Sequence, residues 1–397
     1  MSRRGLCAAA AVAAIVAPSA GAASGAKFVD LNVPTGGFSL AVPGTWKLVT
    51  TPVPQLAAAA KDGTLKLFVA DPAVKGSVYM NVFAQRLGSV PVQNVATSTA
   101  AAIRKSLGQK AKVTNAPFPI SAGTAYVIHI QGKASGTNDS DEFLLMHDGV
   151  EYALIYVASP SLWAKYQPTF LASVRSFKYL ASPNLNPVVL KGSQVGHGYK
   201  LVAFPGGTSF IGEPTLDLCA GSYPSETLRT GRLQVEYTHP KKTVSVSNEV
   251  VTYVTGGAKE AFAEVSKVAR SCSAKAVVKT ANGVTVVYKT SPLRDPKLPG
   301  ALSVKIVEEQ SKGKQHVTET GVAVYQIKGN TLSGVYVFVD PGTTFADAER
   351  VAFHAAEQSK NNLSKSPSSG SGSVSGSGSG SKGKGKTGTT GSKGFVA

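Results

Sequence analysis

The sequence predicts an α+β protein of two tandem domains, each an antiparallel sheet flanked by helices, followed by a disordered C-terminal tail. Short stretches rich in β-branched and aromatic residues recur along the chain, and each half places one amphipathic helix among them and a second helix at its end. The phrase GFSLAVPGTW at 37–46 returns as GYKLVAFPGG at 198–207. The repeated order makes an internal duplication a candidate; the alternative is a chance likeness between two α+β domains.

In the first half, alternation and turn residues define the expected elements. Alternating stretches predict two strands up to Pro43 and two more before a helix at 91–107, whose apolar residues repeat every three or four positions and which Gly108 ends. A hairpin turn is expected at Asp148 and Gly149, because glycine adopts a positive φ freely. The later strands and the closing helix are expected at 111–118, 122–131, 140–147, 150–158 and 161–176.

The second half repeats this plan. Thr344 and Asp347 form a capping pair that should start a closing helix. Gly329 and Asn330 mark the last hairpin turn, where the first half has Asp148 and Gly149. The expected strands and the middle helix lie at 231–239, 245–254, 257–271 (helix), 275–282, 284–291, 302–309, 316–329 and 332–340.

Composition divides the chain into five parts. The first, 1–22, has two arginines, a short apolar run and the small residues Ala20-Gly21-Ala22, which is typical of a secretory signal peptide. A lipid anchor on Cys7 is the less favoured alternative. A Pro- and Asn-rich stretch predicts a linker, and a Gly/Ser/Lys-rich tail is expected to be disordered. The expected boundaries are 1–22 (signal peptide), 23–180 (first domain), 181–196 (linker), 197–363 (second domain) and 364–397 (tail).

The formal charge is +18, from 41 Lys and Arg against 23 Asp and Glu. Because 1–22 reads as a signal peptide and no second apolar run of membrane-spanning length follows, the mature chain is expected to be exported, either secreted or associated with the cell envelope. An anionic envelope polymer, a lipid or a protein is a candidate partner; the alternative is that the charge only maintains solubility. Nucleic acid is not expected as a partner, because the lysines are dispersed and their densest cluster lies in an aromatic-poor tail.

Two cysteines remain after the signal peptide, Cys219 and Cys272. Neither has a CxxC partner or a histidine at metal-ligand spacing, so a disulfide is favoured over a reactive thiol or a metal site. The bridge would join the end of the middle helix of the second domain to the loop before its strands.

The first domain resembles the Mog1/PsbP-like fold, most closely LpqN-type envelope proteins. The resemblance rests on the opening marked by Phe38, Pro43 and Trp46 and on the closing strand–helix unit that ends at Ser176 and Phe177, and it covers 28–180. It implies a central antiparallel sheet flanked by helices and a binding or assembly role without enzymatic activity. The second domain is similar in pattern to bacterial extracellular sensor-like domains, which implies a further binding module.

Motifs for catalysis, metals and cofactors are not expected in this chain. GSKGKGKT at 380–387 matches the phosphate-binding loop pattern, but it lacks the preceding strand and following helix that the motif needs. His129 is expected to be a hydrogen-bonded histidine within a strand. Asp139, Asp141 and Glu142 lack the glycine and distal glutamate of a calcium loop, and we expect a solvated hairpin edge.

Aromatic residues provide the only candidate site. These residues could line a ligand groove between the sheet and the closing helix of the first domain, or could simply form its core: Trp46, Tyr152, Tyr156, Trp163 and Tyr166. The sequence therefore predicts an exported, non-enzymatic binding or assembly module of a bacterial cell envelope, with a small apolar or anionic ligand. The alternative is an envelope hydrolase or polymer-processing enzyme whose site forms only in space.

Overall fold

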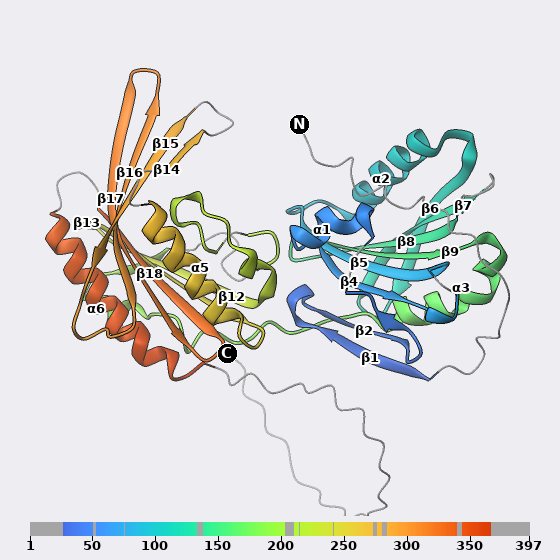
Figure 1. Cartoon of the computed structure of the whole chain (residues 1–397), viewed down its shortest axis with the longest axis horizontal. Helices are drawn as coiled ribbons and strands as arrows, with labels where there is room; N and C mark the ends of the chain where they lie inside the picture. The colour runs from blue at the N-terminus through green and yellow to red at the C-terminus, as the bar shows by residue number, and fades with distance from the viewer. Residues whose placement is uncertain are drawn as a thin grey trace, which may run out of the picture. The chain divides into compact units, whose positions relative to one another are not determined.

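The computed structural model contains antiparallel sheets and helices in two sheet-bearing halves, which confirms the α+β class (Figure 1). We call residues 27–182 the N-terminal half and the residues from 183 onward the C-terminal half. The structure describes residues 27–50, 53–74, 76–132, 138–202, 210–213, 215–240, 242–272, 276–279, 284–339 and 344–366. The expected signal peptide at 1–22, the phosphate-loop match at 380–387 and the tail beyond Ser366 lie outside these residues.

The N-terminal half has two antiparallel sheets. The smaller has the order β1-β2-β10, and the larger has the order β3-β4-β5-β9-β8-β7-β6. Their strands are β1 (Phe28–Val33), β2 (Phe38–Pro43), β3 (Lys47–Leu48), β4 (Leu65–Ala70), β5 (Val78–Arg86), β6 (Ala111–Ile120), β7 (Gly123–Gly132), β8 (Asp139–His147), β9 (Val150–Ala158) and β10 (Lys178–Tyr179). The helices are α1 (Ala57–Lys61), α2 (Val92–Leu107) and α3 (Pro160–Arg175), with short 3-10 turns at Pro34–Gly36, Pro54–Leu56, Pro72–Val74 and Gly108–Lys110.

The larger sheet buries both of its faces, and β9 lies at its centre. Tyr152, Leu154 and Tyr156 belong to the core cluster on the α3 side. Ala153 and the partly buried Ile155 belong to the cluster on the α2 side. Successive side chains of a strand point to opposite faces, so one central strand serves both cores.

The C-terminal half contains one antiparallel sheet with the order β11-β12-β13-β18-β17-β16-β15-β14. Its strands are β11 (Lys200–Val202), β12 (Arg229–His239), β13 (Lys242–Tyr253), β14 (Ala276–Lys279), β15 (Thr285–Leu293), β16 (Leu302–Lys312), β17 (Gln315–Lys328) and β18 (Thr331–Val339). Its helices are α4 (Gly192–Val195), α5 (Gly257–Cys272) and α6 (Phe345–Leu363), with 3-10 turns η5 (Leu218–Ala220) and η6 (Pro224–Leu228).

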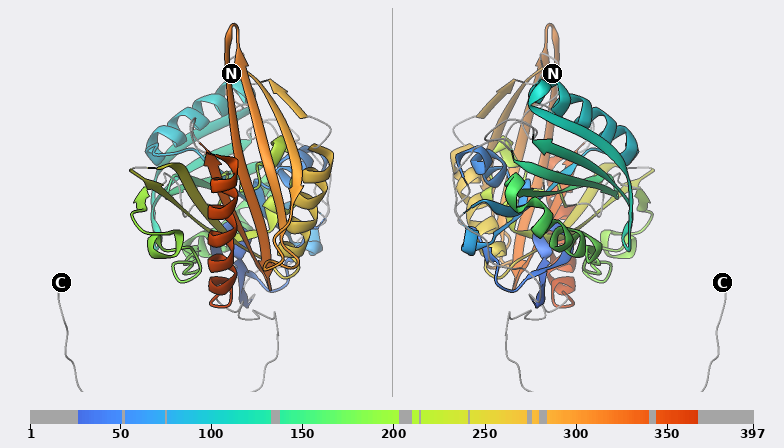
Figure 2. Two further views of the ribbon diagram at one scale, coloured as in Figure 1. Left: turned by 90° about the vertical axis from the view of Figure 1, so that its left-hand side faces the viewer. Right: turned by 90° about the vertical axis from the view of Figure 1, so that its right-hand side faces the viewer.

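Helices α5 and α6 cover opposite faces of this sheet. The core cluster on one face contains the apolar stripe of α5, and the cluster on the other contains α6. Figure 2 shows α6 lying along the strands, and Figure 1 shows the hairpin β16–β17 extending past both helices. Four fully buried alanines let α6 approach the sheet closely: Ala348, Ala352, Ala355 and Ala356.

The two halves share a strand order. Along the N-terminal half, the chain order is β4-β5, helix α2, β6-β7-β8-β9 and helix α3. Within the sheet, β9 lies next to β5. Along the C-terminal half, the corresponding order is β12-β13, α5, β15-β16-β17-β18 and α6. Within the sheet, β18 lies next to β13. The second sheet differs by the added edge strand β14. The strand order therefore recurs, but the two copies of the repeated phrase do not occupy equivalent strands. Residues 38–43 form β2 of the smaller sheet, whereas 200–202 form β11 at the edge of the eight-stranded sheet. An internal duplication stays a prediction.

Two segments pack into parts of the structure that differ from those expected from the sequence. The expected linker at 181–196 contains five buried apolar side chains that join core clusters of the C-terminal half: Leu185, Val188, Val189, Leu190 and Val195. Phe210 and Ile211, expected in the second domain, belong to a core cluster of the N-terminal half. Among the described residues, no helix is long and apolar enough to cross a membrane.

Candidate functional site

A cavity of about 400 Å³ lies beside Tyr152, and we call it the Tyr152 cavity. It combines an aromatic floor with a polar rim, the composition that small-ligand sites generally have. Its lining residues are Gly37, Arg86, His147, Asp148, Val150, Tyr152, Leu180, Ser182, Phe210 and Ile211.

Tyr152 forms the floor from the central strand β9. Its ring packs edge-on against Phe38 and Phe177, with centroid separations of 6.1 and 5.7 Å. Burial raises the pKa of its phenol, so the hydroxyl stays protonated and can donate a hydrogen bond. Gly37 lies above it with a φ of 70°, and a Cβ there would lie 3.4 Å from the Tyr152 hydroxyl. Glycine at this position lets the backbone turn close to the ring.

The β8–β9 hairpin turn supplies one wall. Asp148 and Gly149 both have positive φ values, 49° and 76°, which confirms the predicted turn. The turn places His147 flat against Tyr179, with ring centroids 3.9 Å apart and an interplanar angle of 13°. The His147 Nε2 atom lies 3.6 Å from the Asp148 carboxylate. A ring and a carboxylate at the mouth give this wall polar groups that can orient a ligand.

Arg86, the last residue of β5, supplies a cation. Its Nε atom lies 2.6 Å from Oε1 of Glu213, and both side chains are partly exposed. Glu213 is the last residue of a short segment, Phe210–Glu213, that we call the strap. Phe210 and Ile211 of the strap are 8% and 5% exposed within the core of the N-terminal half. Gly212 has a φ of 72°, and a Cβ there would meet Cβ of Arg86 at 2.7 Å, so the strap needs glycine here.

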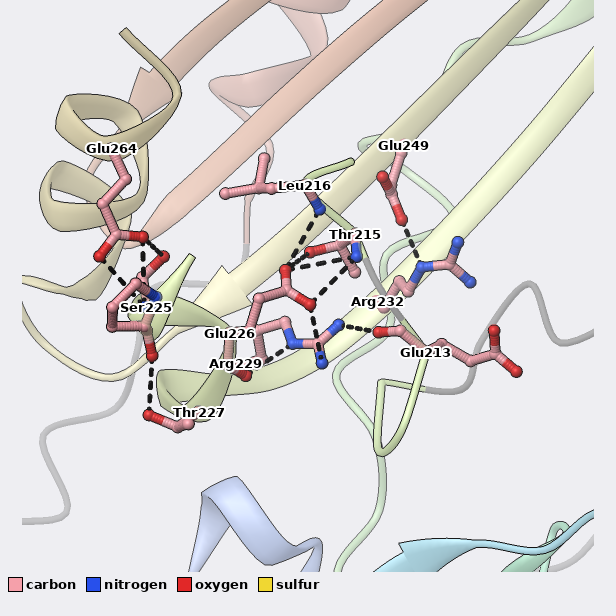
Figure 3. A network of polar contacts seen from close by, with 11 residues as sticks. Glu213, Thr215, Leu216, Ser225, Glu226, Thr227, Arg229, Arg232, Glu249 and Glu264 are labelled. Carbon is pink, nitrogen blue, oxygen red and sulfur yellow. Dashed lines mark hydrogen bonds and ion pairs between the residues drawn. The ribbon is translucent and has the colours of Figure 1, made fainter. Parts of the chain in front are cut away.

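A network of polar contacts holds the chain on either side of residue 214 (Figure 3). The Glu226 carboxylate accepts hydrogen bonds from the backbone N–H groups of Thr215 and Leu216, each at about 3.2 Å, and from the Thr215 hydroxyl. Arg229 donates through Nη1 to the carbonyl of Glu213 and pairs through Nη2 with Glu226 at 3.2 Å. The network therefore fixes both the end of the strap and the residues that follow it.

Two further contacts extend this network (Figure 3). Glu264 on α5 accepts from the backbone N–H of Ser225 at 3.2 Å and from its hydroxyl at 2.6 Å, which fixes the start of η6 to the helix. Arg232 and Glu249 form an ion pair between neighbouring strands, and both are almost completely buried. A carboxylate that accepts hydrogen bonds from backbone N–H and hydroxyl groups of a loop anchors that loop, and we assign Glu226 and Glu264 this role.

The disulfide stabilises the same region. Cys219 and Cys272 are joined, with Cα atoms 6.1 Å apart, as the cysteine count predicted. The bond links η5 to the last residue of α5. Cys219 and Ala220 both have left-handed backbone conformations, with φ values of 57° and 49°, which non-glycine residues adopt at a cost.

The five predicted groove aromatics come together in one core cluster. Of these, only Tyr152 lines a cavity described above. The others are packed at 9% exposure or less: Trp46, Tyr156, Trp163 and Tyr166. Core packing was the alternative that the sequence left open, and a ligand role for these four side chains stays a prediction.

The acidic residues on β8 require a correction. Asp139 and Asp141 are 6% and 4% exposed, and Glu142 is partly buried, so the three residues do not form a solvated edge. Asp141 lies opposite His129 on β7 and bonds its Nδ1 at 2.6 Å, and Asp139 accepts from the backbone N–H of Gly132 at 2.7 Å. His129 is hydrogen-bonded within the sheet, as expected. The alternation of polar and apolar residues along β8 did not show that α3 covers the face on which Asp139 and Asp141 lie.

Sequence reasoning did not find Arg86 or the glutamates of the network. The available signal was PSETLR at 224–229, a proline followed closely by an acidic and a basic residue, but its partners lie far along the chain. Among the described residues, no group of three or more His, Cys, Asp or Glu side chains is placed to hold a metal ion.

Comparisons with known proteins identify only distant similarity. No family model and no curated protein matches the chain. A solution structure of cyanobacterial PsbP (CyanoP) from Synechocystis sp. PCC 6803 aligns at 11% identity and a TM-score of 0.30, over 41% of this chain and 98% of that one. The extracellular domain of PknH from Mycobacterium tuberculosis aligns at 14% identity and a TM-score of 0.33, over 46% of this chain and 97% of that one. At these TM-scores neither structure assigns the chain to a family.

Proposed function

We propose that this protein is an exported, non-enzymatic binding module of a bacterial cell envelope, and that its small ligand occupies the Tyr152 cavity. The observation that carries this proposal is the cavity itself, where a buried aromatic floor meets the polar groups of Arg86, His147 and Asp148. A volume of about 400 Å³ suits a small organic molecule. Export rests on the expected signal peptide at 1–22.

The network around Glu226 supports a binding role. It fixes the strap by hydrogen bonds to backbone groups, so the wall made by Phe210 and Ile211 is positioned before a ligand arrives. A preformed wall reduces the entropy lost on binding. The Glu226 and Glu264 carboxylates accept hydrogen bonds from backbone N–H groups, which suits them to anchoring.

Native mass spectrometry of protein purified gently from its own envelope tests this proposal. Ser182 is an exposed residue of the cavity wall, and Ser182→Trp would fill the cavity without changing the core. The neighbouring exposed Ala181 is not part of the lining, so Ala181→Trp is the matched control. We expect a reproducible added mass on the wild type and on Ala181→Trp, and none on Ser182→Trp.

Two results would count against the proposal. An added mass that Ser182→Trp retains would place the ligand elsewhere. A bare mass for all three proteins would favour assembly through protein partners, which a pull-down with the mature chain would then test. A separate check on export is the N-terminal peptide of the mature protein, which should begin close to residue 23.

A further inference from the structure

A second cavity, of about 430 Å³, is also lined by Arg86 and by the strap, and we call it the Lys66 cavity. Six ionisable residues line it: Asp62, Lys66, Arg86, Glu213, Glu226 and Arg229. Their formal charges cancel, so the pairing of each group decides which charge is available to a ligand.

Five of the six have partners. Arg86 pairs with Glu213 at 2.6 Å, and Arg229 pairs with Glu226 at 3.2 Å. Asp62 accepts hydrogen bonds from the backbone N–H and the hydroxyl of Thr64, at 3.0 and 2.8 Å. Each of these five groups therefore has an ion-pair or hydrogen-bond partner within the protein.

Lys66 is the exception. It lies on β4 and is partly buried, and among the described residues its ammonium has no ion pair or hydrogen bond. Burial and the nearby positive charge of Arg229 lower the pKa of Lys66 to about 8, and Asp62 opposes that shift. A cation that is removed from water without a counter-ion destabilises the folded state, and an anion beside it would offset that cost.

We propose that the Lys66 cavity binds the oxyanion group of a small molecule, a phosphate or a carboxylate, through the Lys66 ammonium. The cavity is larger than the oxyanion, so the rest of the molecule has room beside it. This site is distinct from the ligand site of the Tyr152 cavity, although the two share Arg86, Phe210 and Ile211.

Isothermal titration calorimetry of the mature chain at pH 8 tests the proposal, with inorganic phosphate and acetate as probes. Lys66→Met removes the charge, and Lys66→Arg retains it. Lys61 is the matched control because it is exposed and does not line the cavity, so Lys61→Met should bind like the wild type. We expect at least one probe to bind the wild type and to bind Lys66→Met at least tenfold more weakly.

Proton uptake gives a second readout that a structural role would not produce. Near pH 8 about half of the Lys66 side chains are neutral, because the pKa is about 8, and a bound anion favours the charged form. Titrations in two buffers of different ionisation enthalpy should therefore show uptake of about half a proton per oxyanion in the wild type. Lys66→Arg should bind without that uptake, because arginine is always charged.

Three results would overturn the proposal. The first is that neither probe binds the wild type, and the second is that Lys66→Met binds as tightly as the wild type when both have the same melting temperature. The third is that Lys61→Met weakens binding as much as Lys66→Met does. Ser182→Trp separates the two sites. Ser182 does not line the Lys66 cavity, so this variant should bind the probe normally even if it loses the ligand of the Tyr152 cavity.

Discussion

The Glu213 carboxylate pairs with Arg86 at 2.6 Å. The carbonyl of the same residue accepts a hydrogen bond from Arg229. One residue thus connects a partly exposed cation on β5 with a buried cation on β12. The two arginines differ in burial, and that difference should decide what each contributes to stability.

Arg86→Met should lower the free energy of unfolding by less than about 1 kcal/mol, since partly exposed ion pairs contribute little. Arg229→Met should lower it by about 3–5 kcal/mol, because it leaves Glu226 and the Glu213 carbonyl without their buried partner. Urea unfolding measures both. Arg350→Met, at an exposed pair on α6, is the control and should resemble Arg86→Met. Equal losses at Arg86 and Arg229 would contradict the assignment of Arg229 as the anchor.

Asp141 should control the titration of His129. The hydrogen bond that the His129 imidazole donates to Asp141 raises the pKa of His129, although partial burial opposes this shift. The charges of Asp141 and Asp139 raise the pKa further, and the charge of Lys112 lowers it. Asp141→Asn should move the His129 midpoint downward in an NMR titration, and Asp30→Asn, at an exposed residue of β1, should not.

The sign of the His129 effect on stability follows from this shift. A histidine whose pKa is raised in the folded state stabilises the fold fully below its unfolded pKa, and the contribution is lost as the pH rises through the folded pKa. The stability lost in Asp141→Asn should therefore be larger at pH 5.5 than at pH 8.5. A midpoint for His129 that is the same in Asp141→Asn and wild type would refute the prediction.

Glu142→Gln should stabilise the protein at alkaline pH. Burial, and then the charge of Glu151, raise the pKa of Glu142 to about 7, so the folded state retains a proton that the unfolded state loses above pH 4.5. Wild-type stability should fall as the pH rises from about 4.5 to 7, and a neutral glutamine removes that loss.

We expect Glu142→Gln to gain roughly 1–3 kcal/mol over the wild type at pH 8 and almost nothing at pH 4. Chemical unfolding at the two pH values measures the difference. Asp30→Asn serves again as the exposed control and should show no such pH dependence. A gain of equal size at both pH values would show that burial of the charge is not the cause.

The disulfide should stabilise the C-terminal half substantially. The bond joins residues separated by 53 positions, and both sulfur-bearing side chains are buried. Replacing both cysteines by alanine should lower the free energy of unfolding by about 2–4 kcal/mol. Thermal unfolding with and without reductant measures this, and thiol labelling of the unreduced, unfolded protein should find neither Cys219 nor Cys272. Two labelled thiols would show that the bond does not form.

Ala220→Gly should have the opposite effect. Ala220 has a φ of 49°, and glycine adopts this conformation without the clash of a Cβ. We expect a gain of about 0.5–1 kcal/mol, reduced by the greater freedom of glycine in the unfolded chain. Ala346→Gly, at an exposed position in the first turn of α6, should instead destabilise by up to about 1 kcal/mol. The same sign for both variants would contradict the assigned strain at Ala220.

Local features of this protein could be predicted from its sequence because neighbouring residues decide them. The apolar stripe that defines α2 and the turn at Asp148 and Gly149 are examples, since spacing and a positive φ are properties of short stretches. Thr344 begins α6 by accepting from the N–H of Asp347 at 3.2 Å, as the capping pair indicated. The pairing of Cys219 with Cys272 followed from the small number of cysteines.

The candidate site could not be predicted in this way. Arg86 meets Glu213, and Glu226 meets Thr215, only because the fold brings separate segments together. The expected solvated edge at Asp139 and Asp141 was wrong because alternation shows which residues share a face of a strand but not what covers that face. The sequence by itself determined the class of the elements and their order, through short-range sterics and hydrophobic periodicity. Only the tertiary structure decided which charges are buried, paired or left without a partner, because burial and Coulomb energies depend on distances between residues remote in the chain.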